Sequence, residues 1–331
     1  MAQGVASGLA RVAHTYVMKQ VSEFIMAQLH RPKARRKSTT QKISEVIQST
    51  KRLLFTFDEV EAWQRDNEYL CGNYRTKSNS YRASLKSMLY LHNQTGNIYS
   101  HLVGAVLFLA YSTNVYDKIT TRYSTADVFD LLAFGVFISS AIICFGISAT
   151  FHIFGNHSSK VYHTWLMLDL YGIFVLIAGT VYSGTYYGFY CEQEYWIMYS
   201  VGITIIVTSA ATLCSLPHFR TPKWRWARAA LFCAIGWSGA FPMTHAAQAF
   251  GVEQAHRQMG WWYFIWEGLS YISGAIIYAL RIPERMRPGL FDIWGCSHQI
   301  FHVCAVVGAA LHLVGLLQAF DYNHDPMTRR C

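Results

Sequence analysis

The sequence has few charged residues. Only 14% of its 331 residues are Asp, Glu, Lys or Arg, whereas roughly a quarter are charged in ordinary soluble domains. The apolar residues, which make up 52% of the chain, are gathered into long runs instead of being spread at amphipathic periods. This pattern excludes a large soluble core and predicts that the apolar residues are buried in lipid.

Cysteine motifs and a cleavable leader are also lacking. The eight cysteines are scattered and form no C-x-x-C pair, which indicates neither a disulfide framework nor a thiolate metal site, so we expect packing roles. The start of the chain has no compact apolar core followed by a small-residue cleavage site. We therefore expect no cleaved signal peptide.

Residues 1–90 contain no apolar run long enough to span a membrane. Apolar residues recur at helical spacing from Val5 to Leu29, which predicts an amphipathic helix. A basic linker from Arg31 to Lys37 follows. The net charge of +9 is concentrated in this region and in a few loops, where it suits anionic lipid headgroups, and we expect no nucleic-acid binding.

Seven apolar runs follow, and each is about twenty residues long, which as a helix matches the hydrocarbon core of a bilayer. We predict spans at 98–116, 128–153, 164–187, 195–216, 227–250, 261–280 and 298–320. Helix is required, because backbone groups in lipid have no water to bond with. The predicted fold class is therefore an all-α integral membrane protein, with a seven-helix domain at 91–320 and a short outer tail at 321–331.

The distribution of lysine and arginine predicts the orientation, because short cytoplasmic loops are richer in these residues. With the N-terminus inside, the inner loops carry Lys160, Arg220, Lys223, Arg225, Arg228, Arg281, Arg285 and Arg287. The outer loops then carry only Lys118, Arg122 and Arg257. We therefore expect a cytoplasmic N-terminus and an outer C-terminus, the inverse of a rhodopsin-like receptor.

Polar residues inside the spans are the candidates for function, because they are costly in lipid unless they face the bundle interior and are paired. His298 and His302 stand at i and i+4 on one helix face. In the predicted orientation the second span ends inside at His152, and the third span carries Asp169 in its second turn. All four residues are thus expected at one depth, near the cytoplasmic ends of their helices.

Three histidines predict a metal site with an open coordination position, which is the arrangement of a catalytic zinc. We expect Zn²⁺ to be held by His152, His298 and His302. Asp169 would hold and deprotonate a water, and Ser148 would hydrogen-bond this water or a substrate oxygen. Imidazole ligands also suit copper, iron or nickel. The competing interpretation is a set of interhelical polar contacts that lock the bundle.

The remaining polar residues receive simpler interpretations. Three histidines are expected to be packing or interfacial residues: His101, His245 and His312. His157 and His163, in the inner loop beside the predicted site, are the second choice as ligands. Glu267 has no evident role, although either snorkelling or a paired polar residue would accommodate it in the membrane.

Several segments together carry a family resemblance. They are Asp66–Leu70, Leu91–Leu102, Ser148–His152, Asp169–Ile173, Arg281–Arg285, Phe291–Trp294 and Ser297–His302. With these segments, residues 57–316 resemble the progestin and adipoQ receptor family, also called haemolysin-III-related, and within it the adiponectin-receptor class. The resemblance implies seven helices, a cytoplasmic N-terminus, a zinc ion on the three histidines and a water held by Asp169. Glu267 departs from the apolar character expected at its position.

Proteins of this family are described as hormone or steroid receptors, as regulators of lipid and zinc homeostasis, and as ceramidase-like hydrolases. An open zinc in an apolar bundle favours a lipid amide hydrolase, with ceramide or another sphingolipid entering from the bilayer. The alternative is a receptor for an extracellular ligand whose zinc is structural; a zinc transporter is a third and weaker hypothesis. We expect the protein in the plasma membrane, and an internal membrane is the alternative location. A homo-oligomer is also compatible with the sequence.

Overall fold

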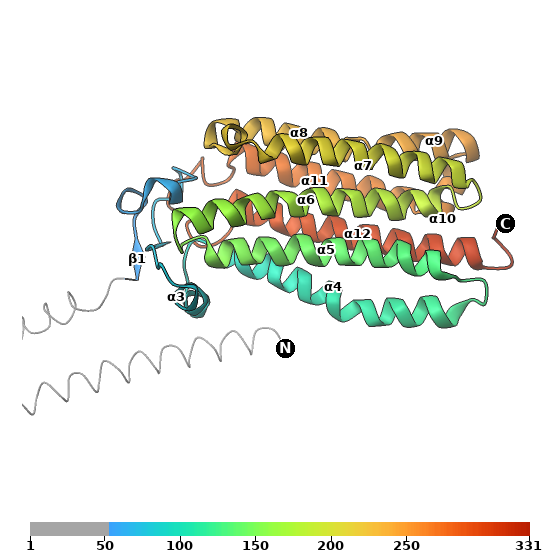
Figure 1. Cartoon of the computed structure of the whole chain (residues 1–331), viewed down its shortest axis with the longest axis horizontal. Coiled ribbons are helices and arrows are strands. Elements are labelled where there is room, and N and C mark those ends of the chain that lie inside the picture. Colours follow the sequence, from blue (N-terminus) through green and yellow to red (C-terminus); the bar gives the residue numbers. More distant parts are fainter. Residues whose placement is uncertain (1–52) are drawn as a thin grey trace, which may run out of the picture.

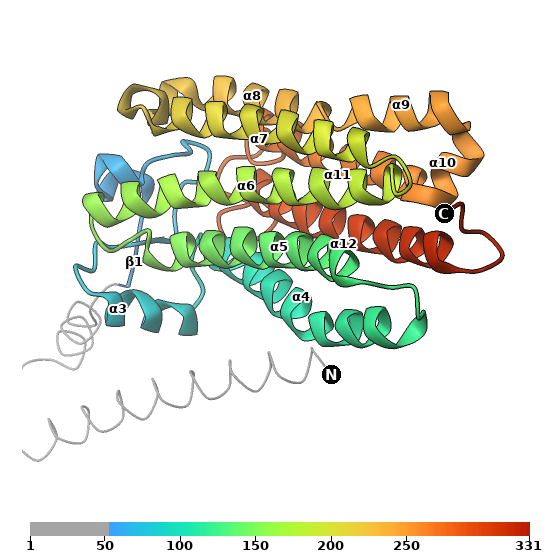
Figure 2. The ribbon, with the colours of Figure 1, turned by 45° about the vertical axis from the view of Figure 1, so that its right-hand side comes forward.

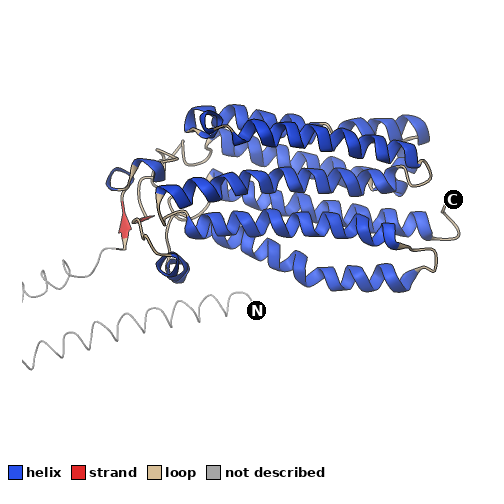
Figure 3. Ribbon diagram, viewed as in Figure 1, coloured by secondary structure: helices blue, strands red, loops and turns tan. Residues whose placement is uncertain are grey.

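The computed structural model describes residues 53–331, and in this part of the chain almost all regular structure is helical (Figure 3). The predicted amphipathic helix at Val5–Leu29 and the basic linker at Arg31–Lys37 lie outside the described residues. The one departure from an all-α fold among the described residues is a pair of two-residue strands, β1 (Leu54–Phe55) and β2 (Tyr74–Arg75), which pair antiparallel.

Long helices lie side by side and form a bundle (Figure 1). Within residues 53–331, five helices are long and apolar enough to cross a membrane: α4 (Thr95–Arg122), α5 (Val128–Phe154), α6 (Ser159–Gly188), α7 (Gln193–Ser215) and α12 (Ser297–His324). Beside them run α8 (Arg225–Trp237), α9 (Ala240–Phe250) and α11 (Trp261–Leu280), with the short α10 (Val252–Met259) before α11. The protein is thus a multi-pass integral membrane protein built from helices.

The predicted spans coincide with helices, with two differences. Helices α4, α6 and α12 extend beyond the predicted 98–116, 164–187 and 298–320, because their end turns are too polar for an apolar run but still helical. The predicted span 227–250 is divided into α8 and α9. The break at Ser238 and Gly239 precedes Pro242, which lacks the backbone N–H that would bond the carbonyl of Ser238 in a continuous helix.

Helix α12 is central to the bundle, where it packs against α4, α5, α6, α10 and α11. Small residues allow the close approach, because a Cβ added at Gly308 would lie only 2.5 Å from the ring of Tyr271 on α11. Large aromatic side chains such as Phe134, Phe137 and Phe320 fill the interior and are fully buried. Apolar side chains on the outward face of α4, such as Val106 and Leu107, are more than half exposed, which suits a lipid-facing surface.

A small polar cap closes one end of the bundle, where α5 ends and α12 begins (Figures 1 and 2). It contains β1, β2, the short helix α3 (Tyr81–Lys86), and 3₁₀ turns at Phe57–Glu59, Ala62–Gln64 and Ser87–Leu89. Further 3₁₀ turns, Pro217–Arg220 and Pro222–Trp224, join α7 to α8. Val60, Leu70, Tyr74 and Cys296 form a small separate core within the cap.

A disulfide bond joins Cys191 and Cys331 at the opposite end of the bundle. The prediction that all cysteines are packing residues was wrong for this pair. The two residues are 140 positions apart in the sequence, and only the folded bundle brings the end of the chain back to the α6–α7 loop. The six other cysteines are all among the described residues and are free.

Candidate metal centre

Three imidazole rings meet at the capped end of the bundle. His152 lies in the last turn of α5, while His298 and His302 lie on one face of the first turns of α12. The ring centroids are 5.0 Å apart between His152 and each of the other two, and 4.7 Å apart between His298 and His302. One nitrogen from each ring lies within 4.8 Å of the others. The structure therefore brings together a set of three histidines that could hold a metal ion.

The ring of His152 is oriented by a side chain at the start of α4. Its Nδ1 lies 2.8 Å from Oε1 of Gln94, an oxygen that also accepts a hydrogen bond from Asn97 Nδ2 at 2.8 Å. Because the amide oxygen only accepts, Nδ1 of His152 carries the proton. The Nε2 atom then holds its lone pair, and it is buried without a hydrogen-bond partner among the described residues.

The ring of His302 is held in the same way by residues in the first two turns of α4. Its Nδ1 lies 3.2 Å from the carbonyl oxygen of Asn97 and 3.1 Å from Oγ of Ser100. A carbonyl oxygen can only accept, so Nδ1 donates and Nε2 is left with its lone pair. Such outer hydrogen bonds fix the tautomer and orientation of metal-binding histidines. Helix α4 can come this close because Gly96 faces Gln299, where an added Cβ would collide at 2.3 Å.

These observations fit a bound metal ion. A buried imidazole nitrogen with no partner is costly, and a metal ion would satisfy the orphaned Nε2 of His152. The donors are neutral imidazole nitrogens without thiolates, a set that suits zinc among the transition metals. Three protein ligands leave room for a fourth, exchangeable one.

The end of α5 is anchored by a buried arginine of the cap. The guanidinium of Arg75 donates to the carbonyl oxygens of His152 at 2.6 Å and Ile153 at 2.9 Å, and to Oγ of Ser87 at 2.7 Å. Burial lowers the pKa of Arg75 to about 10, so it remains cationic at neutral pH. A cation at a helix C-terminus stabilises the exposed carbonyls and opposes the negative end of the helix dipole. Arg75 thereby fixes the backbone of a candidate ligand.

The start of α12 is anchored by a buried carboxylate. Glu284 is fully buried and accepts from the backbone N–H of Ser297 at 2.8 Å, from Nδ2 of Asn67 at 3.1 Å, and from the Ser297 hydroxyl. A carboxylate at a helix N-terminus satisfies the free N–H groups and the positive end of the dipole. Glu284 therefore ties the loop before α12 and the cap to the turn that carries His298.

A small cavity of about 50 Å³ leads from the cap to the histidines. Its lining includes His152 and His298 from the cluster, and Gln94, Arg75 and Asp66 from the cap side. This volume is large enough for water, because one water molecule needs about 10–15 Å³ of such space. The polar lining also provides the hydrogen-bond partners that a buried water requires. Water thus has a polar route to the candidate metal centre.

Asp169 and Ser148 form a second polar pair. Asp169 lies on α6 and Ser148 on α5, where the hydroxyl of Ser148 faces the carboxylate of Asp169. Ser148 Oγ is buried and has no hydrogen-bond partner of good geometry among the described residues. Ser148 precedes His152 by four positions, so it lies one helical turn away on the same face. The carboxylate is not part of the three-histidine set.

The other histidines near this end take different positions. His157 packs against Tyr81 with ring centroids 4.3 Å apart, and the exposed His163 packs against Tyr162. Neither belongs to the three-histidine set. His101, which was expected to be a packing or interfacial residue, stacks on His302 with centroids 3.6 Å apart. Both of its ring nitrogens are buried without a hydrogen-bond partner among the described residues.

Glu267 acquires a clear structural role. Its carboxylate lies 2.7 Å from Nδ1 of His312, and Nε2 of His312 lies 2.9 Å from Oγ of Ser183. All three side chains are buried between α11, α12 and α6. The paired polar partner expected for Glu267 is therefore present, and His312 serves in packing between helices. His245, which bonds Tyr199 through its Nδ1 at 3.0 Å, also serves in packing.

Sequence reasoning missed the residues that hold the candidate ligands in place: Gln94, Arg75 and Glu284. They lie in the cap and loops, where no periodicity predicts which side chain points inward. A buried arginine or glutamate is detectable only once the fold shows its burial. Gln94 and Glu284 do lie in the motifs Leu91–Leu102 and Arg281–Arg285, but the sequence assigns them no partner.

Comparison with known proteins agrees with this architecture. Residues 89–313 match the model of the family described as haemolysin-III related. The chain is 34% identical over 293 residues to the "ADIPOR-like receptor IZH2" of Saccharomyces cerevisiae, an alignment that covers 87% of this chain and 92% of that protein. Both the matched region and the aligned share exceed half of the chain.

Relatives in animals and plants are similar to the same region. The "Adiponectin receptor protein" of Drosophila melanogaster is 34% identical over 269 residues, which cover 81% of this chain but only 60% of that protein. The "Heptahelical transmembrane protein 4" of Arabidopsis thaliana is 32% identical, with 80% of this chain and 88% of that protein covered. On these matches, the chain belongs to the haemolysin-III-related family of adiponectin-receptor-like membrane proteins.

Proposed function

We propose that this protein is a zinc-dependent hydrolase that cleaves the amide bond of ceramide or a related sphingolipid. One observation carries the proposal: the hydrogen bonds to Gln94 and Asn97 leave the Nε2 atoms of His152 and His302 available for a metal ion at a buried, water-accessible position. Ser148, one helical turn from His152, would supply the hydroxyl that such a reaction needs, and Asp169, whose carboxylate faces Ser148, would supply the proton acceptor.

When bound, zinc would act as a Lewis acid toward the amide carbonyl and lower the pKa of water. Asp169 accepts a proton from the attacking water and returns it to the leaving nitrogen, so that water and amide give a fatty acid and an amine. Ser148 donates a hydrogen bond to the water or to a substrate oxygen. His152, His298 and His302 hold the metal, and Gln94, Asn97 and Ser100 keep two of the three rings in place.

The proposal includes seven spans, a cytoplasmic N-terminus and an outer C-terminus, with α8 and α9 together as the fifth span and α11 as the sixth. The excess of Lys and Arg in the predicted inner loops supports this orientation. The disulfide between Cys191 and Cys331 supports it independently, because such bonds persist on the oxidising side of a membrane. A plasma-membrane location is part of the proposal, and an internal membrane with an oxidising lumen is its alternative.

The test is the release of fatty acid from ceramide by the purified protein in lipid, with zinc measured in the same samples. We expect Asp169→Asn to retain most of the metal and to lose most of the activity, because an amide can bond the water but cannot take its proton. Asp117→Asn, an exposed aspartate on α4, is the matched control and should behave as the wild type.

Removal of zinc by a chelator should abolish activity, and added zinc should restore it. Equal activity in the wild type, Asp169→Asn and the chelated protein would mean that a contaminant performs the reaction. Loss of zinc in Asp169→Asn would contradict the division of roles between the carboxylate and the three histidines.

A receptor with a structural zinc is the second candidate, and the names of the yeast and fly relatives favour it. In that case the metal holds α5 to α12, and an extracellular ligand binds at the other end of the bundle. Absence of ceramide hydrolysis in a zinc-loaded, folded wild-type protein would favour the receptor over the enzyme.

A further inference from the structure

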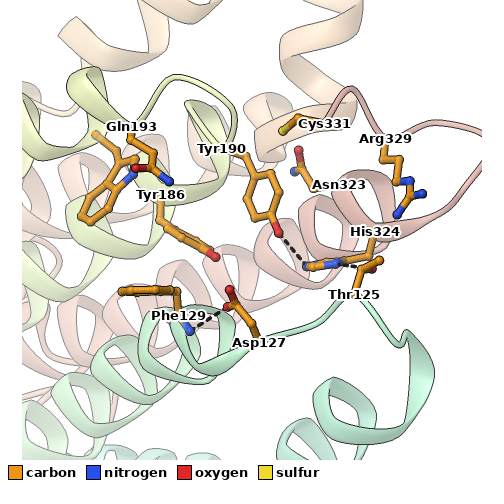
Figure 4. A pocket seen from close by; sticks show the side chains of 11 residues that line it. Thr125, Asp127, Phe129, Tyr186, Tyr190, Gln193, Asn323, His324, Arg329 and Cys331 are labelled. Carbon is orange, nitrogen blue, oxygen red and sulfur yellow. Dashed lines mark hydrogen bonds between the residues drawn. The ribbon is translucent and has the colours of Figure 1, made fainter.

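A second cavity lies at the other end of the bundle, away from the three histidines (Figure 4). Its volume is about 310 Å³, within the range of small-molecule sites. It is formed by the start of α5, the end of α6, the start of α7, the end of α12 and the last residues of the chain. The lining residues used below are Asp127, Tyr186, Tyr190, Trp196, His324 and Arg329.

Three aromatic rings form one side of this cavity. The centroid of Tyr186 lies 5.5 Å from that of Tyr190 and 6.0 Å from that of Trp196, with an interplanar angle of 77° in both pairs. Rings set nearly at right angles form the walls of an aromatic box. The face of each ring is electron-rich, so a box of this kind attracts a cation, and methylated ammonium groups in particular.

Acidic side chains lie beside these rings and are held by hydrogen bonds. Asp127 caps α5 by accepting from the N–H of Phe129 at 2.8 Å and of Asp130 at 3.3 Å. The fully buried Asp130 accepts from the hydroxyl of Tyr187 at 2.8 Å and lies 3.0 Å from Nε2 of His324. In Figure 4, Tyr190 points toward His324, consistent with a separation of 3.4 Å between its hydroxyl and Nε2 of His324. The hydroxyl of Tyr186 also donates to Asp130, at 3.4 Å, so these contacts fix the walls and place negative charge close to the rings.

The chain's last residues bring a positive charge to the mouth of the cavity. The disulfide between Cys191 and Cys331 and the ion pair of Arg330 with Glu192, at 2.7 Å, hold this segment against the start of α7. Arg330 also lies over the ring of Phe250, 4.6 Å from its centroid. Arg330 therefore contacts Glu192 and Phe250, whereas the exposed Arg329 lines the cavity.

We propose that this cavity binds a phosphocholine group. The aromatic box and Asp127 would receive the quaternary ammonium, and Arg329 would receive the phosphate, which guanidinium groups bind well. The cavity opens at an end of the bundle, at the depth of lipid headgroups, so the group can belong either to a lipid or to a free metabolite. The site is separate from the histidines, and the proposal does not depend on the hydrolase activity.

The first experiment measures binding by calorimetry to full-length protein purified in a maltoside detergent. The probes are phosphocholine, choline and phosphoethanolamine. Phosphocholine should bind saturably and roughly five- to tenfold more tightly than choline, because the phosphate adds a charge-assisted contact with Arg329. Phosphoethanolamine should bind more weakly than phosphocholine, because a primary ammonium is more strongly hydrated and fits the aromatic box less well.

Matched variants separate the parts of the site. Trp196→Ala should weaken phosphocholine about tenfold, while Trp262→Ala, a partly exposed tryptophan outside the cavity, should have no effect. Asp127→Asn keeps a residue that can cap α5 and should weaken both choline and phosphocholine. This variant tests the site even where Trp196→Ala fails to fold.

The segment that carries Arg329 and Cys331 gives a prediction that a purely structural role of these residues would not give. Arg329→Gln should remove the preference for phosphocholine over choline and leave choline binding unchanged. Cys331→Ser should do the same, because it releases the segment that carries Arg329. If phosphocholine binds no better than phosphoethanolamine, or if Trp196→Ala and Asp127→Asn bind as the wild type does, the proposal is wrong.

A lipid experiment distinguishes the two sources of the group. Protein in nanodiscs of phosphatidylcholine or of phosphatidylglycerol is titrated with phosphocholine. If phosphocholine binds more weakly in phosphatidylcholine nanodiscs than in phosphatidylglycerol nanodiscs, the lipid headgroup competes for the site and is the ligand. If phosphocholine binds equally well in both, the ligand is free phosphocholine. Absence of saturable phosphocholine binding in both nanodiscs and in detergent would overturn the proposal.

Discussion

Glu284→Ala should destabilise the protein and weaken metal binding together. The substitution removes the acceptor for the backbone N–H of Ser297, for the Ser297 hydroxyl and for Nδ2 of Asn67, at a position with no exposed surface. Leaving buried donors without a partner costs about 1–3 kcal/mol each. Together with the lost charge at the helix N-terminus, the expected loss is at least about 3 kcal/mol.

The matched control is Glu253→Ala on α10. Glu253 forms an i,i+4 ion pair with Arg257, and their side chains are 75% and 60% exposed. An exposed pair of this kind contributes about 0.3–0.5 kcal/mol. Comparison of the two variants therefore separates a buried helix anchor from an ordinary surface charge.

The assay is thermal unfolding in detergent, with and without saturating zinc. Zinc stabilises the folded state by an amount that grows with the logarithm of its affinity, and Glu284→Ala should reduce this increment because the turn carrying His298 and His302 is less well held. An equal loss of stability in the Glu284 and Glu253 variants would refute the anchoring role. If Glu284→Ala is destabilised but zinc stabilises it as much as the wild type, Glu284 does not support the metal centre.

Three further outcomes are expected. Gln94→Ala should lower zinc affinity about 10- to 100-fold without abolishing binding, measured by competition with a chelator, because it removes the hydrogen bond that orients His152; wild-type affinity would contradict this. Glu267→Ala should lower stability by about 1–3 kcal/mol in thermal unfolding, because it leaves Nδ1 of His312 without a partner in the bundle, while zinc content stays unchanged; a loss of zinc would show coupling that the geometry does not predict. A tag after Cys331 should be accessible on intact cells and a tag before Arg31 should not; the reverse labelling would overturn the orientation.

The helices were accessible to sequence reasoning because lipid leaves the backbone few alternatives. Long apolar runs predict their own secondary structure, and only the break at Ser238–Gly239 and the polar end turns escaped this argument. Histidines at i and i+4 likewise share a helix face whatever surrounds them. The approach of His152 to His298 and His302 followed from placing helix ends at one depth, and the structure brings these three rings together.

The contacts around the rings could not be found in the same way. Arg75 bonds a carbonyl 77 positions away, Gln94 bonds a histidine 58 positions away, and Asn67 bonds a glutamate 217 positions away. Such contacts depend on how the cap folds over the bundle, which no local periodicity encodes. The disulfide and the cavity beside it depend in turn on where the last helix ends. The roles of Asp169 and Ser148 stay predictions, which rest on the position of Ser148 one turn from His152 and on its contact with Asp169.

Zinc stoichiometry tests the central claim most directly. Purified wild-type protein should contain about one equivalent of zinc per chain, and the variant with both His298→Ala and His302→Ala should contain almost none, because the remaining imidazole cannot hold the ion alone. His312→Ala, which removes a buried histidine bonded to Glu267, should keep the full equivalent. Unchanged zinc in the double variant, or its loss in His312→Ala, would contradict a metal centre formed by His152, His298 and His302.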